Sequence, residues 1–168
     1  MNQNGLLALY TYNAYANSRL LDTAALLSEE EFSRESSPSL GSVRILLLHM
    51  FAVEATYLRR CQERPFELKP TDLVTFADIQ HHWSKLAQEQ QEFIRSLDDG
   101  QLERTISFSL REHTFQLPWW QLLTQAFVHS THHRGELSIV LSGLGHPLPT
   151  LDIIAQFVEA SGQRWPWA

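Results

Sequence analysis

The sequence predicts an all-α protein built around a four-helix bundle, and two observations lead to this prediction. Four long stretches carry apolar side chains every three or four positions, which is the period of a helix with one buried face. The breaks between them contain the proline, glycine and serine residues that commonly end helices. The chain has 168 residues, which fits a single domain over residues 1–168 with a real core.

The amino-acid composition of the chain argues against several classes of binding partner. The formal net charge is -6 and lysine and arginine form no cluster, which argues against nucleic acid or an anionic membrane as the main partner. No apolar run reaches the roughly 20 residues that a membrane-spanning helix needs, so we expect a soluble protein. Cys61 is the single cysteine and cannot form an internal disulfide, which suits the reducing cytoplasm. We interpret it as a semi-buried helix residue rather than a nucleophile.

The first predicted helix runs from about Asn4 to Leu27, where the apolar stripe is broad. Ser28 is followed three residues later by Glu31, which has the form of a capping box. This short segment is either the exposed end of the first helix or a further capped turn. A polar break follows over residues 33–41.

The second predicted helix follows Ser42, a good N-cap residue, and extends to Cys61. Its inward stripe is predicted to be Ile45, Leu46, His49, Val53, Thr56 and Tyr57. A histidine therefore takes a core position. Taken by itself, His49 is more typical of a core residue with a backbone hydrogen bond than of a metal ligand.

Residues 63–75 contain two prolines and are predicted to form a loop before the third helix, residues 76–97. Trp83 falls on the apolar stripe of this helix and is expected in the core. His81 and His82 fall off the stripe and are expected to face solvent.

Asp98-Asp99-Gly100 is predicted to end the third helix. Apolar residues then alternate over residues 103–117, which predicts a short β-hairpin with Arg111-Glu112 at its turn. The hairpin is expected to cover one end of the bundle. His113 is interpreted as a strand residue, not a ligand.

The fourth predicted helix, residues 118–145, opens with a proline and closes with a glycine. Its inward stripe is predicted to be Leu122, Ala126, His129, His133, Leu137, Val140 and Leu144. His129 and His133 are four residues apart, so both rings can reach one point on the same face. His132 lies on a mixed face and is interpreted as a flanking residue.

A short helix over residues 151–160 and a tail with two tryptophans end the sequence. The tryptophans of the tail are expected to pack either on the bundle or on a second subunit. The sequence leaves both alternatives open.

If the second and fourth helices are neighbours, His49 can join His129 and His133 in one interior cluster. Three imidazoles suit a divalent ion such as zinc, nickel, iron or manganese. No fourth protein ligand is found on the same faces, and a site with an open position is typical of catalysis. The H-E-x-x-H motif is absent, which argues against a zincin protease.

Glu136 lies beyond the two histidines of the fourth helix and has two interpretations. The favoured one is a solvated carboxylate that pairs with Arg134 or a neighbouring helix. The other makes Glu136 a hydrogen-bond acceptor behind a ligand, or a base that acts through bound water.

Several segments resemble one known family over nearly the whole chain: YNAYANSRLLD, SVRILLLHMFAVEATYL, HSTHHRGELSIVLSGLGHP and PLPTLDII. They are similar to the DinB/YfiT-like family of proposed metalloenzymes, most specifically in H-x3-H-R-G. The resemblance implies an up-down-down-up bundle, usually a homodimer, with a divalent metal on a triad that falls on His49, His129 and His133. Glu136 departs from the pattern, because family members often carry glutamine there.

The resemblance also implies a range of activities, since relatives include thiol transferases that use bacillithiol or mycothiol, and a maleylpyruvate isomerase. Our first hypothesis is therefore a metal-dependent enzyme that activates a thiol or water to attack a small molecule, with a low-molecular-weight thiol as one candidate substrate. The second is a non-catalytic, metal-binding stress-response homodimer. The third is a metal-free helical interaction module.

Overall fold

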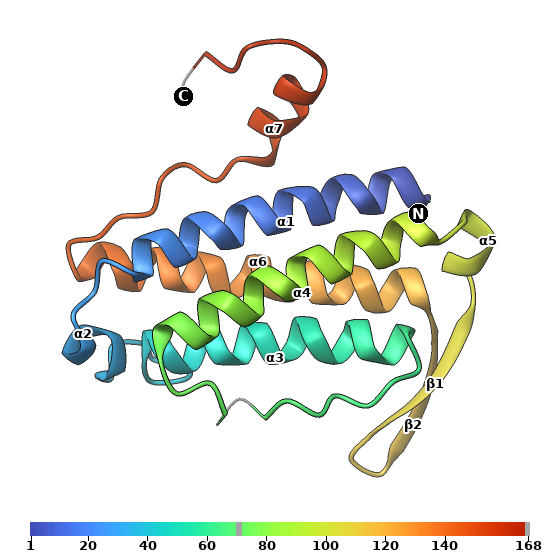
Figure 1. The fold of residues 1–168 in the computed structure, drawn as a ribbon, viewed down its shortest axis with the longest axis horizontal. Helices are drawn as coiled ribbons and strands as arrows, with labels where there is room; N and C mark the ends of the chain where they lie inside the picture. Colours follow the sequence, from blue (N-terminus) through green and yellow to red (C-terminus); the bar gives the residue numbers. More distant parts are fainter. Residues whose placement is uncertain (70–71, 167–168) are drawn as a thin grey trace.

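Four long helices dominate the computed structural model, which describes residues 1–69 and 72–166 (Figure 1). They are α1 (Gln3–Ala24), α3 (Val43–Cys61), α4 (Phe76–Ser96) and α6 (Trp119–Gly143). They lie side by side, with α3 against α6 and α4, and with α1 against α4 and α6. The prediction of a mainly helical protein is confirmed, and α3 and α6 are neighbours as the predicted histidine cluster requires.

Three short helices and one hairpin complete the fold. They are α2 (Glu29–Ser33), α5 (Asp99–Leu102), β1 (Thr105–Leu110), β2 (His113–Pro118) and α7 (Ile153–Ala160). The two strands pair antiparallel with Leu110 opposite His113, so the turn falls at Arg111 and Glu112 as predicted. Arg111 has a φ of 54°, the left-handed conformation that this turn needs. His113 is exposed in β2, which agrees with its assignment as a strand residue.

The helix starts follow the predicted caps. The hydroxyl of Ser42 accepts a hydrogen bond from the amide of Ile45 at the start of α3. Ser28 and Glu31 form a complete capping box, so this segment is a separate short helix rather than the end of α1. Such caps satisfy amides that would otherwise lack a partner in the first turn.

The predicted end of the third helix is confirmed, because α4 ends at Ser96. A short helix that was not predicted follows at once: the side chain of Asp98 accepts from the amide of Gln101 and caps α5. An aspartate before a glycine is compatible with both roles, because Asp is also a preferred N-cap residue.

The predicted buried face of α3 was rotated from the observed one. Ile45 is 49% exposed, whereas Leu47 and Met50 are completely buried. The reason is that α3 packs against both α4 and α6, so its buried arc is wider than one stripe and is centred away from His49. His49 therefore lies at the edge of the core and is only half-buried.

The core has two clusters, one toward each end of the long helices. Trp83 is in the first cluster, as predicted, while His81 is exposed and His82 is half-buried against the backbone oxygen of Asp78. Cys61 is in the second cluster and is more deeply buried than predicted; burial raises the pKa of its thiol to about 12.

The C-terminal segment stands apart from the four long helices (Figure 1). None of the residues of α7 is buried. Trp165 lines a cavity together with Tyr15 of α1, so this tryptophan packs toward the chain's own helices. The second tryptophan of the tail, Trp167, lies outside the described residues. No helix among the described residues is long and apolar enough to cross a membrane.

Candidate metal centre

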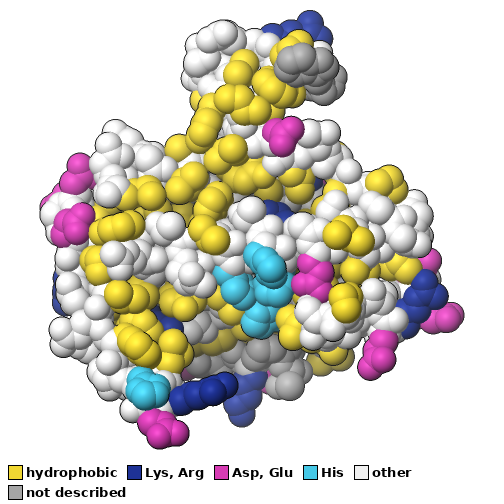
Figure 2. Space-filling view, turned by 180° about the vertical axis from the view of Figure 1, so that it is seen from behind, with side chains coloured by type: hydrophobic (Ala, Val, Ile, Leu, Met, Phe, Trp, Pro, Cys, Tyr) yellow, Lys and Arg dark blue, Asp and Glu magenta, His cyan; other side chains and the backbone are white. Residues whose placement is uncertain are grey.

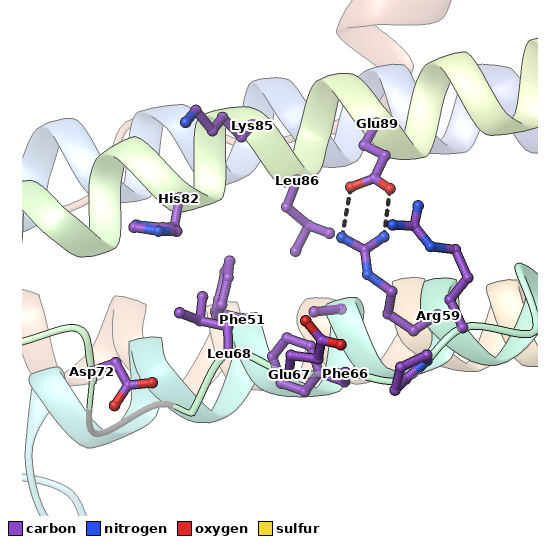
Figure 3. Close-up of a pocket in the computed structure, with 13 residues that line it drawn as sticks. Phe51, Arg59, Phe66, Glu67, Leu68, Asp72, His82, Lys85, Leu86 and Glu89 are labelled. Carbon is purple, nitrogen blue, oxygen red and sulfur yellow. Dashed lines mark hydrogen bonds and ion pairs between the residues drawn. The ribbon is translucent and has the colours of Figure 1, made fainter.

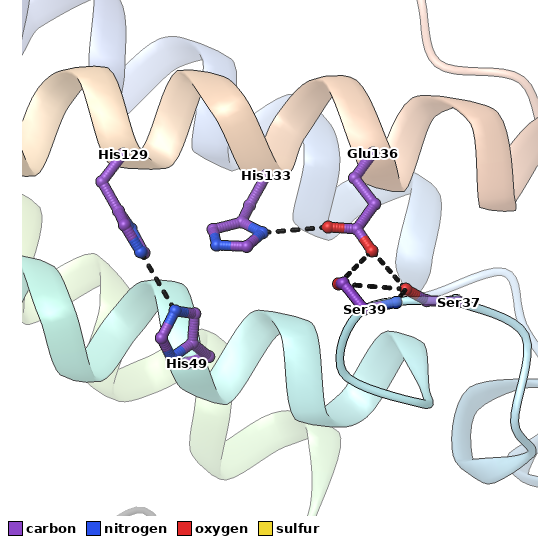
Figure 4. A network of polar contacts seen from close by, with 6 residues as sticks. All are labelled: Ser37, Ser39, His49, His129, His133 and Glu136. Carbon is purple, nitrogen blue, oxygen red and sulfur yellow. Dashed lines mark hydrogen bonds and ion pairs between the residues drawn. The ribbon is translucent and has the colours of Figure 1, made fainter.

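The three predicted histidines converge between α3 and α6 (Figure 4). Nε2 of His49 lies 3.0 Å from Nε2 of His129, although the two residues are 80 positions apart in the chain. The ring centroid of His133 lies 5.0 Å from the ring centroid of His49 and 4.6 Å from that of His129. One nitrogen from each ring can be chosen so that all three lie within 4.8 Å of one another. The cluster could therefore hold a metal ion.

The separation of the His49 and His129 nitrogens is close to that of two ligands on one divalent ion. Two nitrogens bound to one tetrahedral zinc at the usual distances of about 2.0–2.1 Å lie about 3.3 Å apart. The two Nε2 atoms of His49 and His129 differ from that separation by a few tenths of an ångström. Small ring movements would therefore be enough to admit an ion.

The cluster is accessible from outside. His49 and His129 are half-buried, and His133 is 8% exposed. Figure 2 shows one large histidine patch on this face, with hydrophobic side chains on some sides and an acidic side chain on another. Among the described residues, the group that contains all three histidines has no fourth donor. A bound ion would keep a position open to a small molecule.

The electrostatics of the site favour neutral rings. Burial, together with a smaller contribution from the neighbouring histidines, lowers the pKa of His129 to about 4. Burial also lowers the pKa of His49, again with a contribution from His133. A metal ligand must be a neutral imidazole, so these rings are in the ligand form at neutral pH.

Glu136 lies directly behind His133, and the favoured interpretation of this residue was wrong. Its Oε2 is 3.0 Å from Nδ1 of His133, and its Oε1 accepts hydrogen bonds from the hydroxyls of Ser37 and Ser39 (Figure 4). Arg134 points to a different face of α6 and binds asparagines of α1. The alternative interpretation, an acceptor behind a ligand, describes the observed contact.

His132 is exposed, in agreement with its assignment as a flanking residue. It nevertheless forms a second group of donors with His133 and Glu136, whose ligand atoms also lie within 4.8 Å of one another. This group shares His133 with the first one.

A buried polar network between the four long helices was not predicted from the sequence. Its centre is the carboxylate of Glu54 on α3, which is 1% exposed. One oxygen accepts from Asn17 at 2.8 Å and from Ser130 at 2.5 Å, and the other accepts from Asn13 and Gln90 at 3.0 Å each. The donors come from α1, α4 and α6, so this one carboxylate ties all four long helices together.

The positive charge in this network is Arg134, which is 4% exposed. Its NH1 group donates to the side-chain oxygens of Asn13 and Asn17 at 2.6 and 2.7 Å. The two asparagines thus connect the guanidinium to the carboxylate of Glu54 without direct contact between the charges. The available signal in the sequence was a pair of asparagines four residues apart in a helix, together with a glutamate inside an apolar one.

A separate cavity of about 590 Å³ lies between α3 and α4 (Figure 3). Phe51 and Leu86 contribute apolar surface, and the ion pair of Arg59 with Glu89 lies along its wall. None of the three clustered histidines lines this cavity. Among the described residues, no member of either group of donors that could hold a metal lines this cavity.

Comparison with known proteins identifies the family. The family model described as "DinB family" matches residues 1–163, almost the entire chain. The chain belongs to the DinB family. This agrees with the resemblance seen in its histidine-containing segments.

Solved structures of two DinB-like proteins have a similar fold. One is from Bacillus subtilis, with 18% identity, a TM-score of 0.65, and coverage of 86% of this chain and 96% of that chain. The other is from Bacillus cereus, with 19% identity, a TM-score of 0.68, and coverage of 89% of this chain and 97% of that chain. No curated protein matches this chain. The similarity supports the fold of a DinB protein and carries no information on the substrate.

Proposed function

We propose that this DinB protein binds one divalent metal ion through His49, His129 and His133. The observation that carries the proposal is the convergence of three imidazoles from two distant segments, two of which are only half-buried. Zinc, nickel, iron and manganese are the candidate ions, because imidazole suits borderline divalent metals. The side chains hold the ion by three neutral nitrogens and leave room for one more ligand.

We propose further that the centre is catalytic. A divalent ion in such a site lowers the pKa of a bound water or thiol and so supplies a nucleophile at neutral pH. The rings of His49 and His129 are half-buried, and hydrophobic side chains lie on some sides of the histidine patch in Figure 2. This arrangement suits transfer or hydrolysis on a small molecule with an apolar part, and a low-molecular-weight thiol is one candidate co-substrate.

We also propose the helix topology and the oligomeric state that membership of the family implies. We infer an up-down-down-up bundle, since α1 and α6 run in one direction in Figure 1 and α3 and α4 run in the other. We also propose a cytoplasmic homodimer. The single buried cysteine is consistent with a reducing compartment, and analytical ultracentrifugation tests the oligomeric state.

The test begins with elemental analysis of untagged protein purified without chelator. The proposal predicts about one divalent ion per chain in the wild type and its loss in His49→Ala. A panel of thiol-transfer and hydrolase substrates is then assayed with the loaded and the stripped protein. Metal-dependent turnover supports the enzyme; bound metal without turnover supports the non-catalytic metal-binding dimer; and absence of metal contradicts both.

A further inference from the structure

Glu136 connects two parts of the chain that are far apart in sequence. One carboxylate oxygen contacts Nδ1 of His133 at 3.0 Å. The other accepts hydrogen bonds from the hydroxyls of Ser37 and Ser39, which are 99 and 97 residues away (Figure 4). The side chain of His133 is 10% exposed and that of Glu136 is 16% exposed. The contact is therefore shielded from solvent, unlike an ordinary surface ion pair.

The loop that carries the two serines is shaped to present their hydroxyls. The amides of Ser36 and Ser37 both donate to the backbone oxygen of Gly41, at 2.7 and 2.8 Å. Gly41 has a φ of 93°, a conformation that favours glycine. The amide of Ser39 donates to the hydroxyl oxygen of Ser37 at 3.2 Å. The loop thus directs both hydroxyls to one oxygen of Glu136 and leaves the other oxygen for the histidine.

The contact decides which nitrogen of His133 can bind a metal. Oε1 of Glu136 already accepts hydrogen bonds from the hydroxyls of Ser37 and Ser39, so this side chain acts as an acceptor, and its other oxygen faces Nδ1 of His133. An ionised carboxylate can only accept, so Nδ1 of His133 carries the hydrogen. The lone pair is then on Nε2, and this nitrogen points toward His49 and His129 in Figure 4.

The other two histidines have no such support among the described residues. Nδ1 of His129 is buried and has no hydrogen-bond partner there. Among the described residues, His49 forms no hydrogen bond other than the one between its Nε2 and Nε2 of His129. His133 is thus the one ring of the three whose outer nitrogen is held by another side chain of the described chain.

We propose that Glu136 is the positioning residue of the metal centre: it fixes the ring of His133 with Nε2 toward the ion, and Ser37 and Ser39 make the 36–41 loop part of that centre. This inference rests on the proposed function. A carboxylate behind a ligating imidazole also makes the ring a stronger donor, because its negative charge stabilises the positive charge that the ring acquires on binding. Glu136 therefore acts on the ion through His133.

An ion bound by His132, His133 and Glu136 would contradict this arrangement. It would use Nδ1 of His133 and would break the contact between that nitrogen and the carboxylate. His132 and Glu136 would then be ligands themselves, and His49 would take no part. The two arrangements make opposite predictions for substitutions at positions 49 and 132.

The first experiment is zinc titration of the stripped full chain by calorimetry. Glu136→Gln keeps an acceptor of the same size but removes the charge, and His132→Gln is the matched control. We expect Glu136→Gln to weaken zinc binding by about 10–100-fold and His132→Gln to leave it unchanged. Equal affinity of Glu136→Gln and wild type overturns the inference, as does loss of binding in His132→Gln with retention in His49→Ala.

The second experiment reads the tautomer of His133 in the metal-free protein by nitrogen-15 NMR. We expect Nδ1–H in the wild type, and a mixture with Nε2–H in the double variant Ser37→Ala/Ser39→Ala and in Glu136→Leu, with unchanged helical circular dichroism. An Nε2–H tautomer in the wild type, or no change in both variants, overturns the inference. This readout needs no ion, so it separates failure of this inference from failure of the proposed metal binding.

Discussion

The side chains of His49 on α3 and His129 on α6 meet with their Nε2 atoms 3.0 Å apart. Burial lowers the pKa of both rings, and His129 reaches about 4. Two neutral imidazoles held this close at the edge of a core have little structural benefit by themselves, because each loses hydration and gains at most one hydrogen bond. A shared metal ion gives this contact a physical reason.

Substituting alanine for His49, His129 or His133 should lower zinc affinity well beyond the roughly 10–100-fold expected for residues that only support a ligand. The measurement is calorimetric titration of the stripped protein. The control is His113→Ala, because His113 is exposed in β2 and belongs to neither group of donors that could hold a metal. Zinc should also raise the melting temperature of the wild type and not that of His129→Ala. Unchanged affinity in any of the three variants would remove that residue from the site.

Glu54→Gln should destabilise the fold by about 3 kcal/mol, within the range for breaking a buried pair of charges. The substitution places an amide group against donors from Asn13, Asn17, Gln90 and Ser130 and removes the charge that compensates a buried guanidinium. The measurement is the urea midpoint and slope.

The matched control for this prediction is Glu92→Gln, since Glu92 is exposed on α4. It should change the free energy of unfolding by less than about 0.5 kcal/mol. A Glu54→Gln protein as stable as this control would show that the buried network does not stabilise the fold.

The metal-free protein should lose stability as the pH falls from about 6.5 toward 4. His129 takes up a proton near pH 6.5 in the unfolded chain but only near pH 4 in the folded one, so the unfolded state binds more protons in this window. The contribution of neutral His129 to the free energy of unfolding is therefore complete above about pH 6.5, and it is lost as the pH falls toward about 4. The measurement is the urea midpoint at several pH values.

Carboxylates also titrate in the lower part of this window, so the informative quantity is the difference between the wild type and His129→Gln. Glutamine does not titrate, so the variant should show a shallower dependence of stability on pH. Parallel curves for the two proteins would mean that His129 does not have a lowered pKa.

Cys61 should not react with a thiol reagent in the native protein at pH 8. It is 1% exposed and burial raises its pKa to about 12, so neither access nor thiolate is available. The measurement is the rate of modification by Ellman's reagent before and after addition of urea, with one equivalent released on unfolding. Fast reaction of the native protein would contradict the buried position of this thiol.

The sequence was informative wherever the determining contacts are local. The spacing of His129 and His133 on one helix is set by the helical period alone, and the caps at Ser28 and Ser42 depend on residues three positions away. His49 could be added only because α3 and α6 were assumed to be neighbours, and that assumption holds in the fold.

The errors come from contacts between distant residues. The partners of Glu136 include a loop about 100 positions earlier, so its local neighbour Arg134 was the wrong choice. The buried role of Glu54 depends on four donors from three other helices, and no spacing along the chain encodes their meeting. The rotation of α3 likewise follows from packing against two helices at once.

The most direct test of the account is a crystal structure of the metal-loaded protein with anomalous scattering at the absorption edge of the metal. We predict one ion about 2.0–2.3 Å from a ring nitrogen of each of His49, His129 and His133, with His133 bound through Nε2 and Glu136 still on Nδ1. An ion on His132, His133 and Glu136, or no ion between α3 and α6, would contradict it.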